Sequence, residues 1–246
     1  MSHAELFRGI AVLIDDEIDK PNDDIRHIQE QIETAGCHIV KFSQLPEDAS
    51  IEYLREVSFF VLDWRLETLN DEDGNPLTGP AARTMQKLND DKAIAFLKKL
   101  KDVCVAPVFV FTNENVEHIE QKIQRHPELS WGDDPPMILV KSKDAFKTVG
   151  VFDVLADWML KAPSVYVLKK WERAYSSAKN ELFKDFYTKS VQWPLVLWKT
   201  YKSDSVSPSA ELGALIARNL LSRMTPFDFD LAPFNDAIEE IGRAHV

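Results

Sequence analysis

Phe59-Phe60-Val61-Leu62-Asp63 is a run of four apolar residues that ends in a carboxylate. A short run that is apolar at every position, rather than at alternate positions, is typical of a strand buried on both faces, as in a parallel sheet. In such sheets, ligands bind in the crevice beyond the carboxyl ends of the strands. The stretch therefore predicts a central parallel strand that carries Asp63 to a functional edge.

Three further apolar runs have the same form, and a weaker strand is predicted over His38–Phe42. The three runs end in polar side chains: residues 10–14 before Asp15-Asp16, residues 108–111 before Thr112, and residues 137–140 before Lys141. Helical spacing between the runs predicts helices over 23–35, 51–54, 92–101 and 114–124, with Gly36 capping the first. The alternation predicts an α/β fold, a doubly wound five-stranded parallel sheet of the flavodoxin-like type, followed by an α-helical C-terminal region.

Charge is unevenly distributed along the 246 residues. The net charge of −11 divides into −12 over residues 1–162 and +1 over residues 163–246. An acidic front half argues against nucleic-acid binding and favours a site that concentrates a divalent cation. The rear half has no basic stripe, so the sequence gives no support to a DNA-binding domain there.

The N-terminal residues lack the basic-then-apolar pattern of a signal peptide, and the sequence has no apolar stretch of about 20 residues, which a membrane-spanning helix needs. We therefore expect a cytoplasmic protein. Its two cysteines, Cys37 and Cys104, lie in or beside apolar runs without metal-ligand spacing, and we expect both to be buried thiols.

The polar side chains at the strand ends form a coherent chemical set. Three carboxylates that converge on one edge repel one another unless a cation binds, and oxygen ligands favour Mg²⁺. A lysine and a threonine hydroxyl at the same edge can neutralise and hydrogen-bond the oxygens of a phosphoryl group. Asp63, at the end of a central strand, is then placed to act as a nucleophile toward phosphorus.

The segments that carry these residues resemble the signature of response-regulator receiver domains of two-component signalling. The matching segments are residues 13–17, 61–64, 110–113 and 139–141, and the resemblance covers about residues 9–160. It implies that Asp15, Asp16, Asp63 and the backbone carbonyl of Arg65 hold Mg²⁺. It also implies that Asp63 accepts a phosphoryl group from a histidine kinase or a phosphotransfer protein. Thr112 would then move toward the acyl phosphate and Lys141 would bridge it, in a signalling protein rather than an enzyme with an external substrate.

The chain also departs from the receiver pattern. Ile138 stands where the family has an aromatic switch residue, and Ser142 stands where it has a proline. Insertions are predicted at about 67–90 and 126–136. The first borders the site, where it is either a lid, a partner-docking element or a disordered loop.

These departures leave other functions open. One is a pseudo-receiver that is never phosphorylated and acts as a protein-interaction module, and another is a phosphate sink in a bacterial defence-type relay. Residue by residue, Asp15-Asp16 also fits a helix cap, and Lys141 also fits a surface charge beside Lys143.

The predicted domains are a receiver over 1–162, an α-helical output or docking region over 163–240, and a non-native tail over 241–246. The tail resembles one reading frame of a sequencing adapter, so we expect the natural chain to continue beyond about residue 240. Apolar residues at helical spacing from Leu168 to Phe186 predict a long helix, read either as an ordinary core helix or as the seam of a homodimer. Residues 193–198 are strongly apolar and are predicted to be buried, and Ser207-Pro208 predicts a further helix start.

Overall fold

The computed structural model describes residues 3–19, 23–66, 79–129, 137–145, 149–224 and 231–235. The chain divides into two units, which we call the sheet unit (Met1–Lys161) and the helical unit (Ala162–Val246). Their boundary lies one residue before the predicted one.

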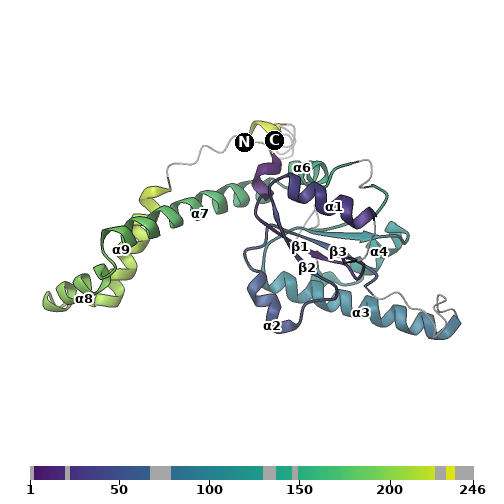
Figure 1. The fold of residues 1–246 in the computed structure, drawn as a ribbon, viewed down its shortest axis with the longest axis horizontal. Helices are drawn as coiled ribbons and strands as arrows, with labels where there is room; N and C mark the ends of the chain where they lie inside the picture. Colours follow the sequence, from purple (N-terminus) through teal and green to yellow (C-terminus); the bar gives the residue numbers. More distant parts are fainter. Residues whose placement is uncertain are drawn as a thin grey trace, which may run out of the picture. The chain divides into compact units, whose positions relative to one another are not determined.

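The sheet unit is built on five parallel strands. They are β1 (Ile10–Ile14), β2 (His38–Phe42), β3 (Phe59–Asp63), β4 (Val108–Thr112) and β5 (Ile138–Ser142), in the order β2-β1-β3-β4-β5 (Figure 1). This confirms the predicted α/β fold, and the order is that of flavodoxin-like folds. The chain crosses from β2 on one side of β1 to β3 on the other, so the crevice expected of this fold lies at the carboxyl ends of β1 and β3.

The burial of each strand explains how clearly its apolar run predicts a strand. Every residue of β3 and β4 is buried, and both strands are apolar up to their last residue. The edge strand β2 is half-exposed, which is why His38 and Lys41 interrupt its apolar pattern.

Helices cover both faces of the sheet. Helices α1 (Asp23–Thr34) and α6 (Val151–Leu160) lie on one face, and α2 (Asp48–Ile51) and α3 (Gly79–Val103) lie on the other (Figure 1). Helix α4 (Val116–Gln124) and the 3₁₀ turns η1 (His3–Phe7), η2 (Glu52–Leu54) and η3 (Pro127–Leu129) complete the described part of this unit. The core on the α3 side includes Phe60, Leu97 and Ile119, and on the other side Phe59 packs edge-to-face on Phe152.

The predicted start of the helix after β3 is wrong, and so is the reading of residues 79–90 as a loop. Helix α3 begins at Gly79 rather than near residue 92, so residues 79–90 are helical. A Gly-Pro pair is a common loop signal, but Pro80 fits the first turn of a helix, where its missing N–H costs nothing. Most residues from Ala81 to Leu88 are good helix formers. Residues 67–78 of this insertion and 130–136 of the second lie outside the described residues.

The ends of the other helices follow local chemistry. Gly36, with a φ of +84°, stands just after α1, as the sequence predicts for a helix cap. Helix α4 begins two residues later than predicted, because the Asn115 side chain caps it by accepting a hydrogen bond from the His118 backbone N–H. Cys37 and Cys104 are both buried and both free thiols.

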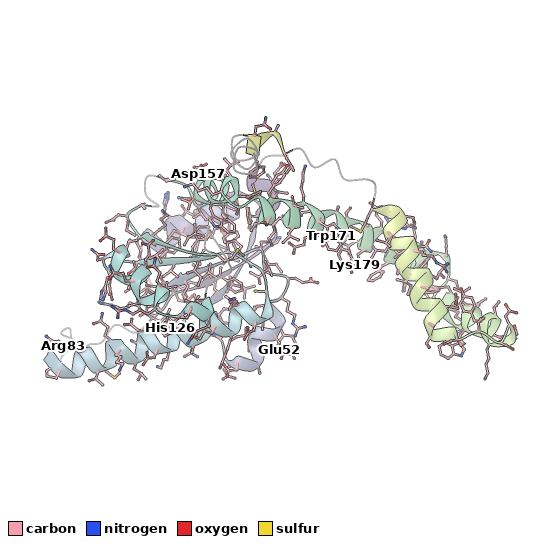
Figure 2. All side chains as sticks on the ribbon, turned by 180° about the vertical axis from the view of Figure 1, so that it is seen from behind. Glu52, Arg83, His126, Asp157, Trp171 and Lys179 are labelled. Carbon is pink, nitrogen blue, oxygen red and sulfur yellow. The ribbon has the colours of Figure 1, made fainter. Side chains whose placement is uncertain are left out.

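The helical unit contains α7 (Pro163–Lys189), α8 (Trp193–Ser203), α9 (Pro208–Arg223) and the short turn η4 (Ala232–Phe234). Helix α9 packs against α7 and α8, and an ion pair of 2.7 Å joins Arg223 to Asp185 on α7. The seam predicted along α7 is only partly covered. Ala178 and Leu182 are buried, whereas Trp171, which projects from the first half of the helix (Figure 2), is exposed.

The prediction that residues 193–198 are buried is wrong. Leu195 and Val196 are 68% and 61% exposed, and α8 has no buried residue. The segment is apolar around most of the helix, but packing against one neighbour covers one side, which half-buries Leu197 and Tyr201. No helix in the described ranges is both long and apolar enough to cross a membrane. Residues 241–246 lie outside those ranges.

Candidate functional site

The site lies at the carboxyl edge of the sheet, where four strands deliver one polar side chain each. Asp63 and Thr112 are the last residues of β3 and β4, and Asp15 and Lys143 come directly after β1 and β5. The register pairs Ile14 with Leu62, Asp63 with Phe111, and Thr112 with Ser142. The four positions are therefore nearly level across the sheet.

Backbone hydrogen bonds carry the sheet ladder past the strand ends. The Asp15 N–H donates to the Phe42 carbonyl at 3.0 Å, and the Lys143 N–H donates to the Thr112 carbonyl at 3.1 Å. At Asp63 the ladder continues through the next residue, Trp64, whose N–H donates to the Phe111 carbonyl at 2.9 Å. The functional side chains thus stand on sheet backbone rather than on free loops, which keeps their geometry precise to the scale that chemistry needs.

This edge collects the buried polar side chains of the sheet unit. Among its described residues, the buried polar or charged ones are Asp15, Asp63, Thr112 and Lys143, exposed by 1%, 6%, 1% and 6%. Burying a charge is costly unless it is paired or binds an ion. Four such residues in one place therefore mark a site rather than a structural accident.

The carboxylates form a cluster of three. One oxygen from each of Asp15, Asp16 and Asp63 lies within 4.8 Å of the others. Two of them are oriented by the backbone: Asp63 Oδ1 accepts from the Arg65 N–H at 3.0 Å, and Asp15 Oδ1 accepts from the Glu17 N–H at 2.8 Å. Each of these two residues then keeps its other oxygen, Oδ2, for a second partner.

That partner is Lys143. Its Nζ lies 2.5 Å from Asp63 Oδ2 and 3.2 Å from Asp15 Oδ2, in a buried ion-pair cluster. Lys141, the lysine predicted for this role, is instead exposed and does not reach the site. Strand β5 runs to Ser142 rather than ending at residue 140, so Lys141 pairs with Phe111 inside the ladder and Lys143 is the lysine that follows the strand.

Burial and the positive charge of Lys143 shift the pKa of Asp63 in opposite directions. Burial raises the pKa of its carboxyl group from 3.8 to about 6, against the lowering effect of the Lys143 ammonium and of the Arg65 N–H. For Lys143, burial acts to lower the pKa, but the charges of Asp63 and Asp15 outweigh it and the pKa is raised. Lys143 is therefore protonated at neutral pH, and Asp63 is an unusually basic carboxylate.

The donor set fits a hard divalent cation. Three carboxylates and one ammonium sum to −2, which one divalent cation balances. Oxygens about 2.1 Å from Mg²⁺ in an octahedron lie roughly 3 to 4 Å from one another, close to the spread of this cluster. Asp15, Asp16 and Asp63 would hold the ion, and the chain places the Arg65 backbone, whose carbonyl is the fourth predicted ligand, directly beside Asp63.

Thr112 presents a buried hydroxyl on the neighbouring strand. Its Oγ1 accepts a hydrogen bond from the Glu114 N–H at 2.9 Å, so the hydroxyl proton remains available to donate. The sequence predicts this residue at this strand end, and the structure places it there.

Two polar networks around the site were not predicted from the sequence. In the first, Arg65 binds Glu114 through Nε at 3.1 Å and Nη2 at 2.6 Å, and Gln86 of α3 donates to the same carboxylate at 3.2 Å. The network joins the residue two after Asp63 to the residue two after Thr112. No local sequence signal links positions this far apart, because only the strand order makes them neighbours.

The second network lies beside the first. The Trp64 indole N–H donates to Asp90 Oδ1 at 2.8 Å, and Lys122 of α4 binds Asp90 Oδ2 at 2.7 Å. Both networks tie α3 to the segments that follow β3 and β4.

A scan against family models and a search of curated proteins give no match to this chain. The fold class therefore rests on the sheet order, and the function rests on the chemistry of the site.

Proposed function

We propose that the sheet unit accepts a phosphoryl group on Asp63, as a receiver in a two-component phosphorelay, with Mg²⁺ at the three carboxylates. The observation that carries the proposal is the set of four buried polar residues at one sheet edge. They are the proposed acceptor Asp63, a second acid, Asp15, the hydroxyl of Thr112, and Lys143, which contacts Asp63 directly. A purely structural edge has no need of these together.

The chemistry follows from the side chains. An Asp63 carboxylate oxygen attacks the phosphorus of a phosphohistidine on a partner kinase or phosphotransfer protein. An O–P bond forms, the P–N bond breaks, and the imidazole leaves with its electron pair and takes up a proton. Bound Mg²⁺ would neutralise charge on the transferring oxygens.

The chain's own residues complete the charge balance. Lys143 Nζ, which contacts Asp63 Oδ2, is placed to pair with a phosphoryl oxygen once Asp63 is esterified. The Thr112 hydroxyl, one strand away, donates to another oxygen. The Arg65 N–H holds Asp63 Oδ1, so Oδ2 is the attacking atom as Lys143 passes from it to a phosphoryl oxygen.

One observation favours the alternative of a scaffold. Lys143 pairs with Asp15 and Asp63, so the acids are partly neutralised from within the chain. A pseudo-receiver that never binds phosphate, acting as a protein-interaction module, would keep this cluster as a buried polar core.

The resemblance to receivers also guides the partner and its compartment. A histidine kinase partner would place the chain in the cytoplasm. With Lys143 as the site lysine, the family's aromatic and proline positions fall on Val140 and Asp144. Neither carries the family residue, so phosphate acceptance would not be read out through the usual aromatic switch.

The test is intact-mass measurement after incubation with Mg²⁺ and acetyl phosphate. We expect one phosphate-sized adduct on the wild type, none on Asp63→Asn, and a normal adduct on Asp102→Asn, an exposed carboxylate at the end of α3. No adduct on the wild type, either with acetyl phosphate or with a phosphorylated kinase, would leave the scaffold as the better function. Adduct on Asp63→Asn would mean that another residue is the acceptor.

A further inference from the structure

The carboxylate of Glu114, beside the site, is bound more fully than an ordinary surface ion pair. It accepts from Arg65 Nε at 3.1 Å and Nη2 at 2.6 Å, and from Gln86 Nε2, which lies 3.2 Å from one oxygen and 3.4 Å from the other. Glu114 is 16% exposed and Arg65 is 56% exposed. Because a pair with an exposed arginine adds little to stability, folding alone gives no reason for four hydrogen bonds at this carboxylate.

The same two residues hold the reactive side chains through their backbone. The Arg65 N–H donates to Asp63 Oδ1 at 3.0 Å, and the Glu114 N–H donates to Thr112 Oγ1 at 2.9 Å. In both cases a side chain is bound by the backbone two residues later. The Arg65–Glu114 ion pair therefore links these two short turns, and with them the positions of the Asp63 carboxylate and the Thr112 hydroxyl.

The third member of the network comes from the part of α3 that was not predicted to be helical. Helix α3 extends past the sheet at its N-terminal end (Figure 1), and Gln86 lies half-buried in that part. Because Gln86 donates to both oxygens of Glu114, it fixes the plane of the carboxylate that Arg65 contacts. The early turns of α3 thereby support the site.

We infer that the Arg65–Glu114–Gln86 network is a positioning device, which keeps Asp63 and Thr112 at the spacing that phosphoryl transfer requires. The inference rests on the proposed function, since it concerns the same acceptor. Arg65 and Glu114 act through the groups they hold, so they are positioning residues rather than catalytic ones. A displacement of about 1 Å can slow a reaction about a hundredfold, so a loosened turn should appear in the rate of transfer.

The experiment measures the initial rate of adduct formation on the full chain by intact mass, with Mg²⁺ and acetyl phosphate, and the unfolding temperature of each variant. An Asp63 oxygen forms the bond to phosphorus, and acetate leaves with the electron pair of the broken O–P bond. We expect Arg65→Gln and Glu114→Gln each to slow the reaction about tenfold and to unfold within about 3 °C of the wild type. The double variant should be no slower than the slower single one, because either change breaks the same pair.

Three further variants test the assignment. Both Arg65 nitrogens contact the same oxygen, Glu114 Oε1, so one ammonium can replace them and Arg65→Lys should keep the rate within about threefold of the wild type. Gln86→Leu should be slower than the wild type and faster than Arg65→Gln. Arg26 pairs with Glu30 on α1 at 3.0 Å, both exposed, so Arg26→Gln removes a surface pair of the same kind and should leave the rate unchanged.

Failure of this inference is distinguishable from failure of the proposed function. Wild-type rates in Arg65→Gln and Glu114→Gln, effects that multiply in the double variant, or an Arg65→Lys chain as slow as Arg65→Gln would each overturn the inference alone. A rate loss accompanied by a large fall in unfolding temperature would assign the network to folding, and a wild-type rate in Gln86→Leu would remove α3 from the device. A wild type that takes up no phosphate would overturn the proposed function, and this inference with it.

Discussion

At the scale of single residues, Lys143 is the side chain on which the site depends most. It is the ammonium that contacts both Asp15 and Asp63, and removing one partner of a buried ion pair leaves the other charges uncompensated. We expect Lys143→Met to lower the free energy of unfolding by about 3 kcal/mol in chelator. Mg²⁺ should recover part of the loss, because the ion takes over the balance of charge.

The neighbouring lysine provides the control. Lys141→Met changes the same residue type two positions earlier, on an exposed side chain, and should alter stability by less than about 0.5 kcal/mol. Urea denaturation of the three proteins, with and without Mg²⁺, measures the difference. Equal effects of the two substitutions would remove Lys143 from the site.

The pKa of Asp63 makes divalent-cation binding dependent on pH. A metal ligand must be deprotonated, and the Asp63 carboxyl has a pKa of about 6. We expect the apparent dissociation constant for Mg²⁺ to rise about tenfold between pH 7.5 and pH 5. Calorimetric titration at the two pH values measures it, and Asp63→Asn should bind more weakly with a flatter pH profile.

The same pKa fixes the sign of the effect on folding. Because the folded-state pKa of Asp63 is raised from 3.8 to about 6, the metal-free fold binds this proton more tightly than the unfolded chain does. The resulting stability is fully present below pH 3.8 and is lost as the pH rises through about 6.

The Mg²⁺ titrations decide whether Asp63 ionises in this range. Equal affinity for Mg²⁺ at pH 7.5 and pH 5 would show that Asp63 does not titrate between them.

At the scale of elements, α3 is the helix that connects the site to the rest of the sheet unit. Its Asp90 accepts from the Trp64 indole and pairs with Lys122 of α4, with both charged side chains less than a fifth exposed. We expect Asp90→Ala to cost about 2 kcal/mol, since it leaves a buried donor and a cation without their partner.

Asp91 is the matched control for this network. It is the next residue on the same helix, has the same side chain and is exposed. Asp91→Ala should change the free energy of unfolding by less than about 0.5 kcal/mol. Thermal denaturation followed by circular dichroism compares the two, and an equal loss would mean that the effect belongs to helix propensity rather than to the network.

At the scale of the whole molecule, the chain has two compact units. We therefore expect each unit to unfold in its own transition and to respond differently to Mg²⁺. On the proposal that Mg²⁺ binds the three carboxylates of the folded sheet unit, the ion should stabilise that unit by about 2.7 kcal/mol at a concentration one hundred times its dissociation constant. The helical unit contains none of the three carboxylates and should not respond.

Differential scanning calorimetry separates the two responses. We expect Mg²⁺ to shift one transition upward and Asp16→Asn to abolish that shift, while the other transition keeps its temperature with and without Mg²⁺. A single transition that Mg²⁺ moves as a whole would mean that the two units unfold together.

The sequence by itself determined the sheet and the types of residue at its edge. Strands of a covered parallel sheet are apolar at nearly every position, so residues 59–62 and 108–111 were recognisable as strands. A polar residue at the end of such a run marks the carboxyl edge of the sheet, where ligands bind. Asp15, Asp63 and Thr112 were predictable for that reason. The helix start at Ser207-Pro208 was predictable because its backbone chemistry is local.

Tertiary structure decided what depends on register and on packing partners. Whether Lys141 or Lys143 reaches Asp63 turns on where β5 ends against β4, which two lysines in the pattern Lys-Ser-Lys cannot reveal. The Arg65–Glu114–Gln86 network exists only because the sheet order makes β3 and β4 neighbours. The exposure of Leu195 and Val196 was not predicted either. An apolar side chain favours burial, but whether another helix covers it depends on how the helices pack.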